Sequence, residues 1–134
     1  INLSYYPTGR NETTVISSIN PAQTNAVYIV NPQTKLDVDF SLRYEKAIIS
    51  VSFDHFANST NRAITVGVFI NDVLIDTEYI KEAKGNSDHM WAAKIFDYDF
   101  GSLSPQNIKI KYGKRGAGGA FVGLSNVRII ISEA

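Results

Sequence analysis

Apolar and polar side chains alternate with a period of two along much of this 134-residue chain. Because successive side chains on a β-strand point to opposite faces, the alternation predicts strands with one buried face. It is clearest in residues 35–44, whose apolar members share one face: Leu36, Val38, Phe40, Leu42 and Tyr44. Helical periodicity is nearly absent from the sequence. The chain is therefore predicted to be all-β.

Further segments repeat this pattern and are separated by residues typical of turns. We expect strands at residues 13–19, 25–30, 49–53, 64–70, 91–100, 107–112 and 121–131. Asn71 and Asp72 tolerate the positive φ of a tight hairpin turn, so a hairpin is predicted there. Only residues 80–83 could form a helical turn. Roughly eight to ten short strands predict a single antiparallel β-sandwich domain over residues 1–134, with jelly-roll topology.

The end of the chain, residues 118–131, runs from a glycine-rich loop into a final apolar strand. Residues 113–119 are rich in glycine and carry two basic side chains, but a phosphate-binding loop needs a helix start after it. A strand follows here, so a flexible hairpin loop that can shape a site is the better interpretation. Val127, Ile129 and Ile131 are expected to close the core.

Composition excludes several function classes. The chain carries 13 basic and 13 acidic residues, so no broad field attracts nucleic acid or an anionic membrane. It has no cysteine, which excludes disulfides, thiolate metal sites and a cysteine nucleophile. Its apolar runs are too short to insert into a membrane, and its first residues do not resemble a signal peptide, so we expect a mature, soluble chain.

The sequence gives little support to the catalytic and metal-binding motifs of known enzymes. The two histidines, His55 and His89, have no zinc-ligand spacing, and no nucleophile elbow is present. Asp97 and Asp99 share one face of a predicted strand, which fits either a carboxylate pair for calcium or acid–base chemistry, or an exposed polar face above an aromatic core face. We favour the exposed face. A glycosidase would need two facing carboxylates, and the sequence indicates no such pair.

Residues 84–91 place several hydrogen-bonding side chains beside the only tryptophan, Trp91. A pyranose has an apolar face that stacks on an aromatic ring and a rim of hydroxyls that bonds to polar side chains, so a sugar site needs both groups together. The alternative is that Trp91 is a core or rim residue at a strand start, which is equally consistent with its sequence position.

The second half of the chain resembles the galactose-binding-like jelly roll of many carbohydrate-binding modules. The resemblance lies in the hairpin of residues 65–75, the paired strands within residues 91–112, and the closing strand of residues 123–129. In that family an aspartate commonly stands where this chain has Ser125, and it helps to hold a structural calcium. The resemblance therefore implies the fold but does not support a calcium here, and we expect no cofactor or metal.

By this resemblance, the chain is expected to be a non-catalytic, lectin-like module that binds a glycan or polysaccharide in an extracellular or secreted setting. Three Asn-x-Ser/Thr acceptor patterns would fit secretion but also arise by chance. Loops at one end of the sandwich would bind the ligand. The candidate ligand-binding residues are Asn86, Asp88, His89 and Trp91, with Tyr112 and Arg115 beside the glycine-rich loop.

Two alternatives remain open at this point. An oligomeric structural or adhesive jelly-roll domain, of the fibre-knob or receptor-binding type, would use apolar surface outside the core. Phe69, Ala92 and Ile130 lie opposite the strongest core stripes and could form such a surface in a homo-oligomer. A glycoside hydrolase is the further alternative.

Overall fold

The computed structural model describes residues 12–57, 62–75, 79–83, 90–116 and 121–133. Within these ranges the chain forms ten strands, no helix and no element long and apolar enough to be a membrane-spanning helix. The strands are β1 (Glu12–Ser18), β2 (Ala22–Thr24), β3 (Gln33–Phe40), β4 (Lys46–Ala57), β5 (Arg62–Ile70), β6 (Val73–Leu74), β7 (Tyr79–Ala83), β8 (Met90–Asp99), β9 (Gln106–Lys114) and β10 (Val122–Glu133).

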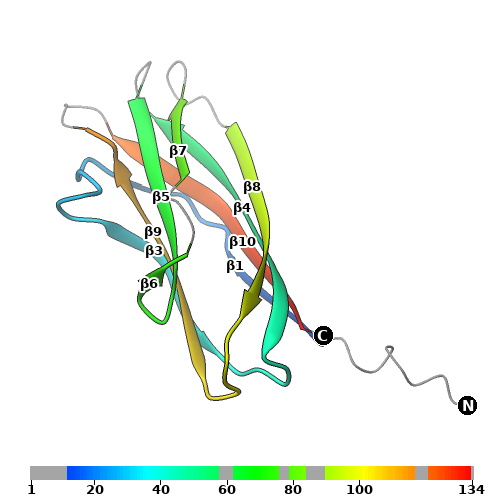
Figure 1. Ribbon diagram of the computed structural model, residues 1–134. Helices are drawn as coiled ribbons and strands as arrows, with labels where there is room; N and C mark the ends of the chain where they lie inside the picture. The colour runs from blue at the N-terminus through cyan, green and yellow to red at the C-terminus, as the bar shows by residue number, and fades with distance from the viewer. Residues whose placement is uncertain (1–11, 58–61, 76–78, 84–89, 117–120, 134) are drawn as a thin grey trace, which may run out of the picture.

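The strands form two antiparallel sheets that pack face to face (Figure 1). One sheet has the order β1-β10-β4-β8, with β2 also paired to β10; the other has the order β3-β9-β5-β6, with β7 also paired to β5. The long pairs are nested in the chain: β1 with β10, β3 with β9, β4 with β8 and β5 with β7. This rolled-up nesting is a jelly roll, so the predicted fold class is confirmed.

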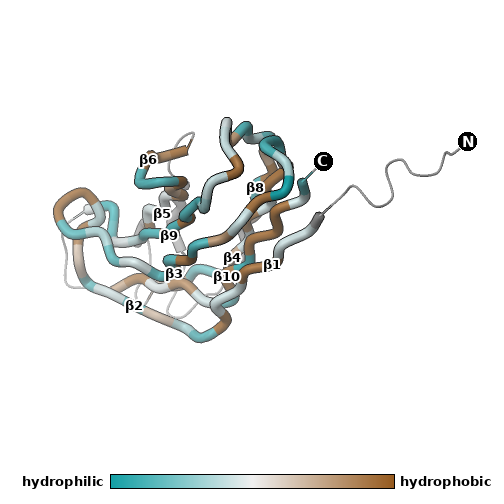
Figure 2. Tube along the Cα trace, turned by 90° about the horizontal axis from the view of Figure 1, so that it is seen from below, coloured by the Kyte–Doolittle hydropathy of each residue, from teal (hydrophilic) through white to brown (hydrophobic). Residues whose placement is uncertain are grey.

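The core lies between the two sheets and is built from the predicted apolar faces. Figure 2 shows the two layers from below, with hydrophobic positions recurring along the strands of both. Ile49, Ile108 and Ile110 are fully buried, as are Ile129 and Ile131. Burying each such side chain contributes about 1.5–3 kcal/mol to folding. Since Val127 is also fully buried, the expected core role of the final strand is confirmed.

The hairpin at Asn71 and Asp72 is confirmed. Their φ angles are 52° and 66°, and Ile70 pairs with Val73 directly across the turn. The Asn71 side chain accepts a hydrogen bond from the Asn107 backbone N–H at 2.9 Å. Lys109 donates to the Asp72 carboxylate, and this hydrogen bond lowers the pKa of Asp72 and raises that of Lys109. Side chains of β9 therefore stabilise the turn.

Two local predictions were wrong. Residues 25–30 are not a strand: β2 ends at Thr24, and the backbone N–H groups of Val30 and Asn31 both donate to the Val27 carbonyl in a turn. This segment leads from the pairing of β2 with β10 in one sheet to the backbone hydrogen bonds of Ala26 and Tyr28 with Lys114 in the other. Residues 80–83 are not helical but belong to β7, because pairing with β5 supplies their backbone hydrogen bonds.

A β-bulge interrupts β10 between Ser125 and Arg128. Asn126 has a φ of 52° and donates its backbone N–H to the Ile19 carbonyl at 3.1 Å. The extra residue shifts the alternation, so that both Leu124 and Val127 point inward although they are three positions apart. The bulge thus allows β10 to contribute buried side chains to the core both before and after the irregularity.

Candidate functional site

Several strands begin or end at one end of the sandwich (Figure 1, top). In the first sheet, Met90, His55 and Leu124 lie in register at this end. In the second sheet, Ala83 and Lys114 occupy the same end, paired with Arg62 and Ile64 of β5. We call this part of the molecule the loop end. Of the predicted site residues that the structure describes, Trp91 lies near the start of β8, Tyr112 near the end of β9, and Arg115 directly after β9.

A polar pocket of about 310 Å³ lies at the loop end. It is lined by Gln23 and Thr24 of β2, by Asn25 immediately after that strand, and by Phe121 immediately before β10. Gln23 and Asn25 are exposed, whereas Thr24 and Phe121 are half-buried. The pocket therefore combines two exposed amide side chains, a hydroxyl and an aromatic ring.

Backbone pairing brings these four residues together. β2 runs antiparallel to the start of β10, with Thr24 opposite Val122, so Thr24 lies next to Phe121. The Thr24 hydroxyl accepts a hydrogen bond from the Ala26 N–H at 3.0 Å. The Ala26 carbonyl in turn accepts from the Lys114 N–H at 2.9 Å. The segment is thus anchored to both sheets, and the pocket backbone is held in place before any ligand binds.

Arg115 is exposed and follows Lys114 directly, one residue beyond the hydrogen bond to Ala26. It therefore flanks the segment that lines the pocket, and its guanidinium is a donor for a polar ligand. Trp91 lies in β8, opposite Asp54 of β4. Asn86, Asp88 and His89 lie outside the described residues, in the connection between Ala83 and Met90.

Tyr112 requires a correction, because its side chain is not at a surface. It is 3% exposed and belongs to the hydrophobic core, in phase with Ile108 and Ile110 on the inner face of β9. Burial also raises the pKa of its phenol. A ring enclosed between two sheets cannot stack on a ligand at the loop end, so Tyr112 is a core residue.

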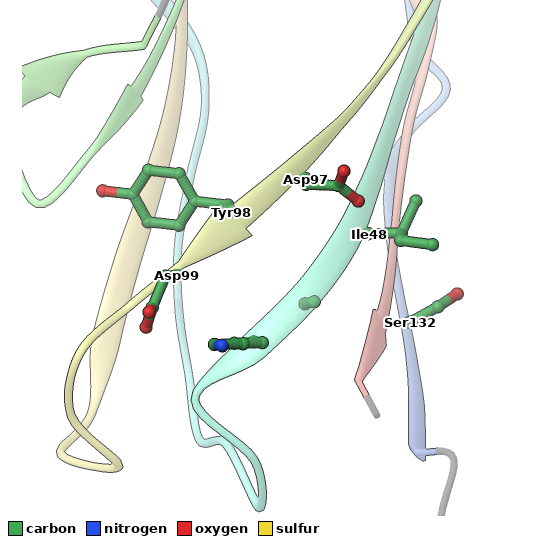
Figure 3. A pocket seen from close by; sticks show the side chains of 7 residues that line it. Ile48, Asp97, Tyr98, Asp99 and Ser132 are labelled. Atoms are coloured by element: carbon green, nitrogen blue, oxygen red, sulfur yellow. The ribbon is translucent and has the colours of Figure 1, made fainter.

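A second hollow, of about 400 Å³, lies at the opposite end of β4 and β8. In Figure 3, Asp97, Ile48 and Ser132 lie on one side of the sheet and Tyr98 points to the other side. Tyr98 packs against the core, and its ring centroid is 4.8 Å from that of Phe100. The predicted exposed polar face above an aromatic core face is thus confirmed for Asp97 and Tyr98.

Asp99 has a structural role, since its carboxylate accepts the Gly101 N–H at 2.9 Å and so supports the turn after β8. Ser125, which stands at the position of the family's calcium aspartate, is buried and lies 3.4 Å from the Asp54 carboxylate. Within the described ranges, no three side chains of His, Asp or Glu gather at metal-binding distances.

None of the four residues that line the pocket was predicted from the sequence: Gln23, Thr24, Asn25 and Phe121. The run Gln23, Thr24 and Asn25 after a proline, and an aromatic residue directly after a glycine-rich loop, are the only local signals. Neither pattern predicts that the two segments are in contact, because they are about a hundred residues apart in the sequence. Only the pairing of β2 with β10 brings them together.

No known protein-family model matches the sequence, and comparison with curated proteins gives no match. Solved structures show similarity in fold. The structure of T=1 particles derived from infectious bursal virus is 7% identical, with a TM-score of 0.64, over 99% of this chain and 36% of the viral chain. The insecticidal δ-endotoxin Cry8Ea1 of Bacillus thuringiensis is 12% identical, with a TM-score of 0.54, over 84% of this chain and 19% of the toxin.

The carbohydrate-binding module TmCBM61, solved in complex with β-1,4-galactotriose, is 9% identical over 90% of this chain and 88% of the module, with a TM-score of 0.42. A score below 0.5 does not establish a common fold. The present chain spans about a third of the viral protein and about a fifth of the toxin. At these identities the likenesses to the viral protein and the toxin show the jelly-roll sandwich alone.

Proposed function

We propose that this chain is a non-catalytic carbohydrate-binding module that holds a glycan at the loop end, in an extracellular or secreted setting. The observation that carries the proposal is the pocket in which Gln23, Asn25 and Phe121 converge. It supplies the two kinds of group that a sugar requires, an aromatic face and amide hydrogen-bonding groups, within one concavity.

The chemistry of recognition follows from these groups. The Phe121 ring packs against the apolar face of a pyranose, and the amides of Gln23 and Asn25 each offer both donors and an acceptor to its hydroxyls. Each hydrogen bond contributes about 0.5–1.5 kcal/mol net. A few such contacts give an affinity in roughly the micromolar to millimolar range. The proposed further contacts are Arg115, Trp91 at the start of β8, and Asn86, Asp88 and His89 from the segment before β8.

Glycan array screening followed by calorimetric titration of a hit tests the proposal. Phe121→Ala removes the stacking surface and is expected to weaken binding about tenfold, or ~1.4 kcal/mol. Trp91→Ala, titrated in parallel, shows whether the ligand also contacts the start of β8. Leu103→Ala is the matched control: Leu103 is a large side chain that is 49% exposed, and it lies near the other end of the sandwich, so the affinity should not change.

The outcome that contradicts the proposal is equally clear. If no glycan binds, or if Phe121→Ala binds a hit as tightly as the unmodified chain does while Tm is unchanged, the pocket is not the site. Unchanged affinity of Trp91→Ala would remove only Trp91 from the proposed contacts.

A second candidate function, an oligomeric structural or adhesive jelly-roll domain, is favoured by one observation. Ile48, Ile95 and Val15 are large aliphatic side chains that lie outside the core and are each more than half exposed. A stable trimer in light scattering, together with no glycan binding, would favour this role over that of a binding module.

A further inference from the structure

The outer face of the β1-β10-β4-β8 sheet is unusually apolar for a surface that points away from the core. Cross-strand register places Val15, Ile130, Ser50 and Ile95 in one row across its four strands. Val15 is 53% exposed and Ile95 is 69% exposed. Ile48, in the next row, is 51% exposed. We call this surface outer face A.

Small, uncharged side chains surround these aliphatic residues. On the same face, the row of Ile48 also contains Thr13 and Ser132. The row on the other side of Ser50 contains Ser17, Ser52 and Ala93. Only two charged residues belong to these three rows, Asp97 on β8 and Arg128 on β10. Outer face A is therefore an apolar centre with one acidic and one basic position at its margin.

The outer face of the other sheet has a different character. Asp37 and Asp39 of β3 both accept hydrogen bonds from the Asn107 amide, at 2.7 and 2.8 Å. The Lys111 ammonium lies 4.9 Å from the centre of the half-buried Phe69 ring and so helps to cover it. This sheet presents a charged, hydrogen-bonded surface that suits water. Among the described strand residues, three large aliphatic side chains that are more than half exposed lie on the first sheet, whereas the second sheet contributes Val73 alone.

We propose that outer face A binds the outer face A of a second copy of this chain, forming a two-fold symmetric dimer. The charges support a second copy as the occupant. Asp97 and Arg128 lie on opposite sides of Ser50. Asp97 is on the neighbouring strand β8, in the row of Ile48, and Arg128 is on the other neighbouring strand, β10, in the row of Ser52. A symmetric interface repeats each contact twice, so it requires a surface that complements itself.

Simple geometry shows that outer face A is self-complementary. With strands about 4.8 Å apart and same-face residues about 6.8 Å apart, Asp97 and Arg128 are each roughly 8 Å from Ser50. Consider a two-fold axis that passes above Ser50, parallel to the sheet and at right angles to the diagonal from Asp97 to Arg128. This axis places Asp97 opposite the partner's Arg128, and Arg128 opposite the partner's Asp97. The same operation brings Ile48 close to the partner's Ile130. The strands then cross steeply, near the orthogonal way of packing sheets.

The size of the surface determines the strength of the dimer. Four strands and three rows of same-face residues cover about 400 Å² per copy, roughly half of the ~800 Å² of a standard interface. The dimer should therefore be reversible and form at micromolar concentrations. It would leave both loop ends free, so two glycan sites would act together on a polyvalent surface. The dimer itself does not depend on glycan binding.

Sedimentation velocity over a concentration series tests the proposal. The unmodified chain should shift from monomer to dimer, and Ile95→Lys should raise the dissociation constant at least about tenfold by placing a charge in the apolar centre. Val73→Lys is the matched control. Val73 is also a β-branched residue and is 61% exposed, but it lies on β6 of the other sheet, so dimerisation should persist.

Charge exchange tests the predicted pairing. Asp97→Arg and Arg128→Asp should each weaken the dimer, whereas the double variant should restore it, because the exchanged residues meet again across the axis. A chain that stays monomeric at 100 µM (about the upper limit for a specific weak dimer) overturns the proposal and leaves outer face A to another domain or protein. An oligomer unaffected by Ile95→Lys also overturns it. Glycan titration of Ile95→Lys separates the two proposals, since the loop end is intact.

Discussion

Gly113 shows how a single residue connects the core to the candidate site. A Cβ at this position would lie 2.8 Å from both the Cα and the N of Tyr28, and 3.1 Å from the Ala26 carbonyl oxygen. These are backbone atoms, which cannot move aside as a flexible side chain can. The absence of a side chain at 113 therefore lets the segment after β2 approach β9 closely enough for the hydrogen bond between Lys114 and Ala26.

Gly113→Ala is expected to destabilise the protein by about 1–3 kcal/mol, the usual cost of overpacking. It should also weaken glycan binding, because it displaces the segment that carries Asn25. Urea unfolding and calorimetry measure the two effects. Gly116→Ala is the control, since a Cβ there meets nothing within 4 Å. Equal stability of the two variants would contradict the close approach.

Tyr112 illustrates how much of the site a sequence reveals. It follows Ile108 and Ile110 at intervals of two, and that phase alone predicts a buried ring. Because aromatic residues often line sugar sites, Tyr112 was instead predicted to bind the ligand, and that prediction is wrong. Where a regular strand is present, its period is the stronger evidence, because both sheets must cover the core.

At the scale of elements, β10 organises the first sheet. It pairs with β1 and β2 along one edge and with β4 along the other, and it carries the bulge at Asn126. At its end, the buried Glu133 accepts the backbone N–H groups of Arg43 and Tyr44, at 2.6 and 2.8 Å. One carboxylate oxygen thus joins the last strand to the connection between β3 and β4, which links the two sheets.

Glu133→Ala is expected to lower the free energy of unfolding by about 2 kcal/mol, because it leaves two backbone donors without an acceptor in a partly buried position. Chemical denaturation measures this loss. Glu45→Ala is a suitable comparison: Glu45 lies in the same connection but is exposed, and its replacement should change the stability by less than about 0.5 kcal/mol. A loss of similar size in both variants would argue against the Glu133 contact.

At the scale of the whole molecule, the nested pairing joins the first strand to the last. β1 and β10 pair along seven residues, from Glu12 with Glu133 to Ser18 with Val127. Almost every strand pair therefore closes a long loop before it gains any contact energy. Such topologies fold slowly for entropic reasons, even when their cores are well packed.

Refolding is expected to take milliseconds to seconds, as in other domains dominated by non-local strand pairs. Stopped-flow dilution from urea, followed by tryptophan fluorescence, measures the rate. Refolding within microseconds would indicate that local structure dominates and would contradict the nested topology.

The sequence by itself determined most of the strands, the sandwich and the Asn71–Asp72 turn, because period-two alternation and positive-φ tolerance are properties of neighbouring residues. Only the tertiary structure decided the pocket and outer face A. Gln23 and Phe121 meet because β2 pairs with β10, and Val15 joins Ile95 in one surface because β10 and β4 lie between their strands. Alternation states which side chains share a face of one strand. Which strands become neighbours depends on the burial and hydrogen bonding of the whole chain at once.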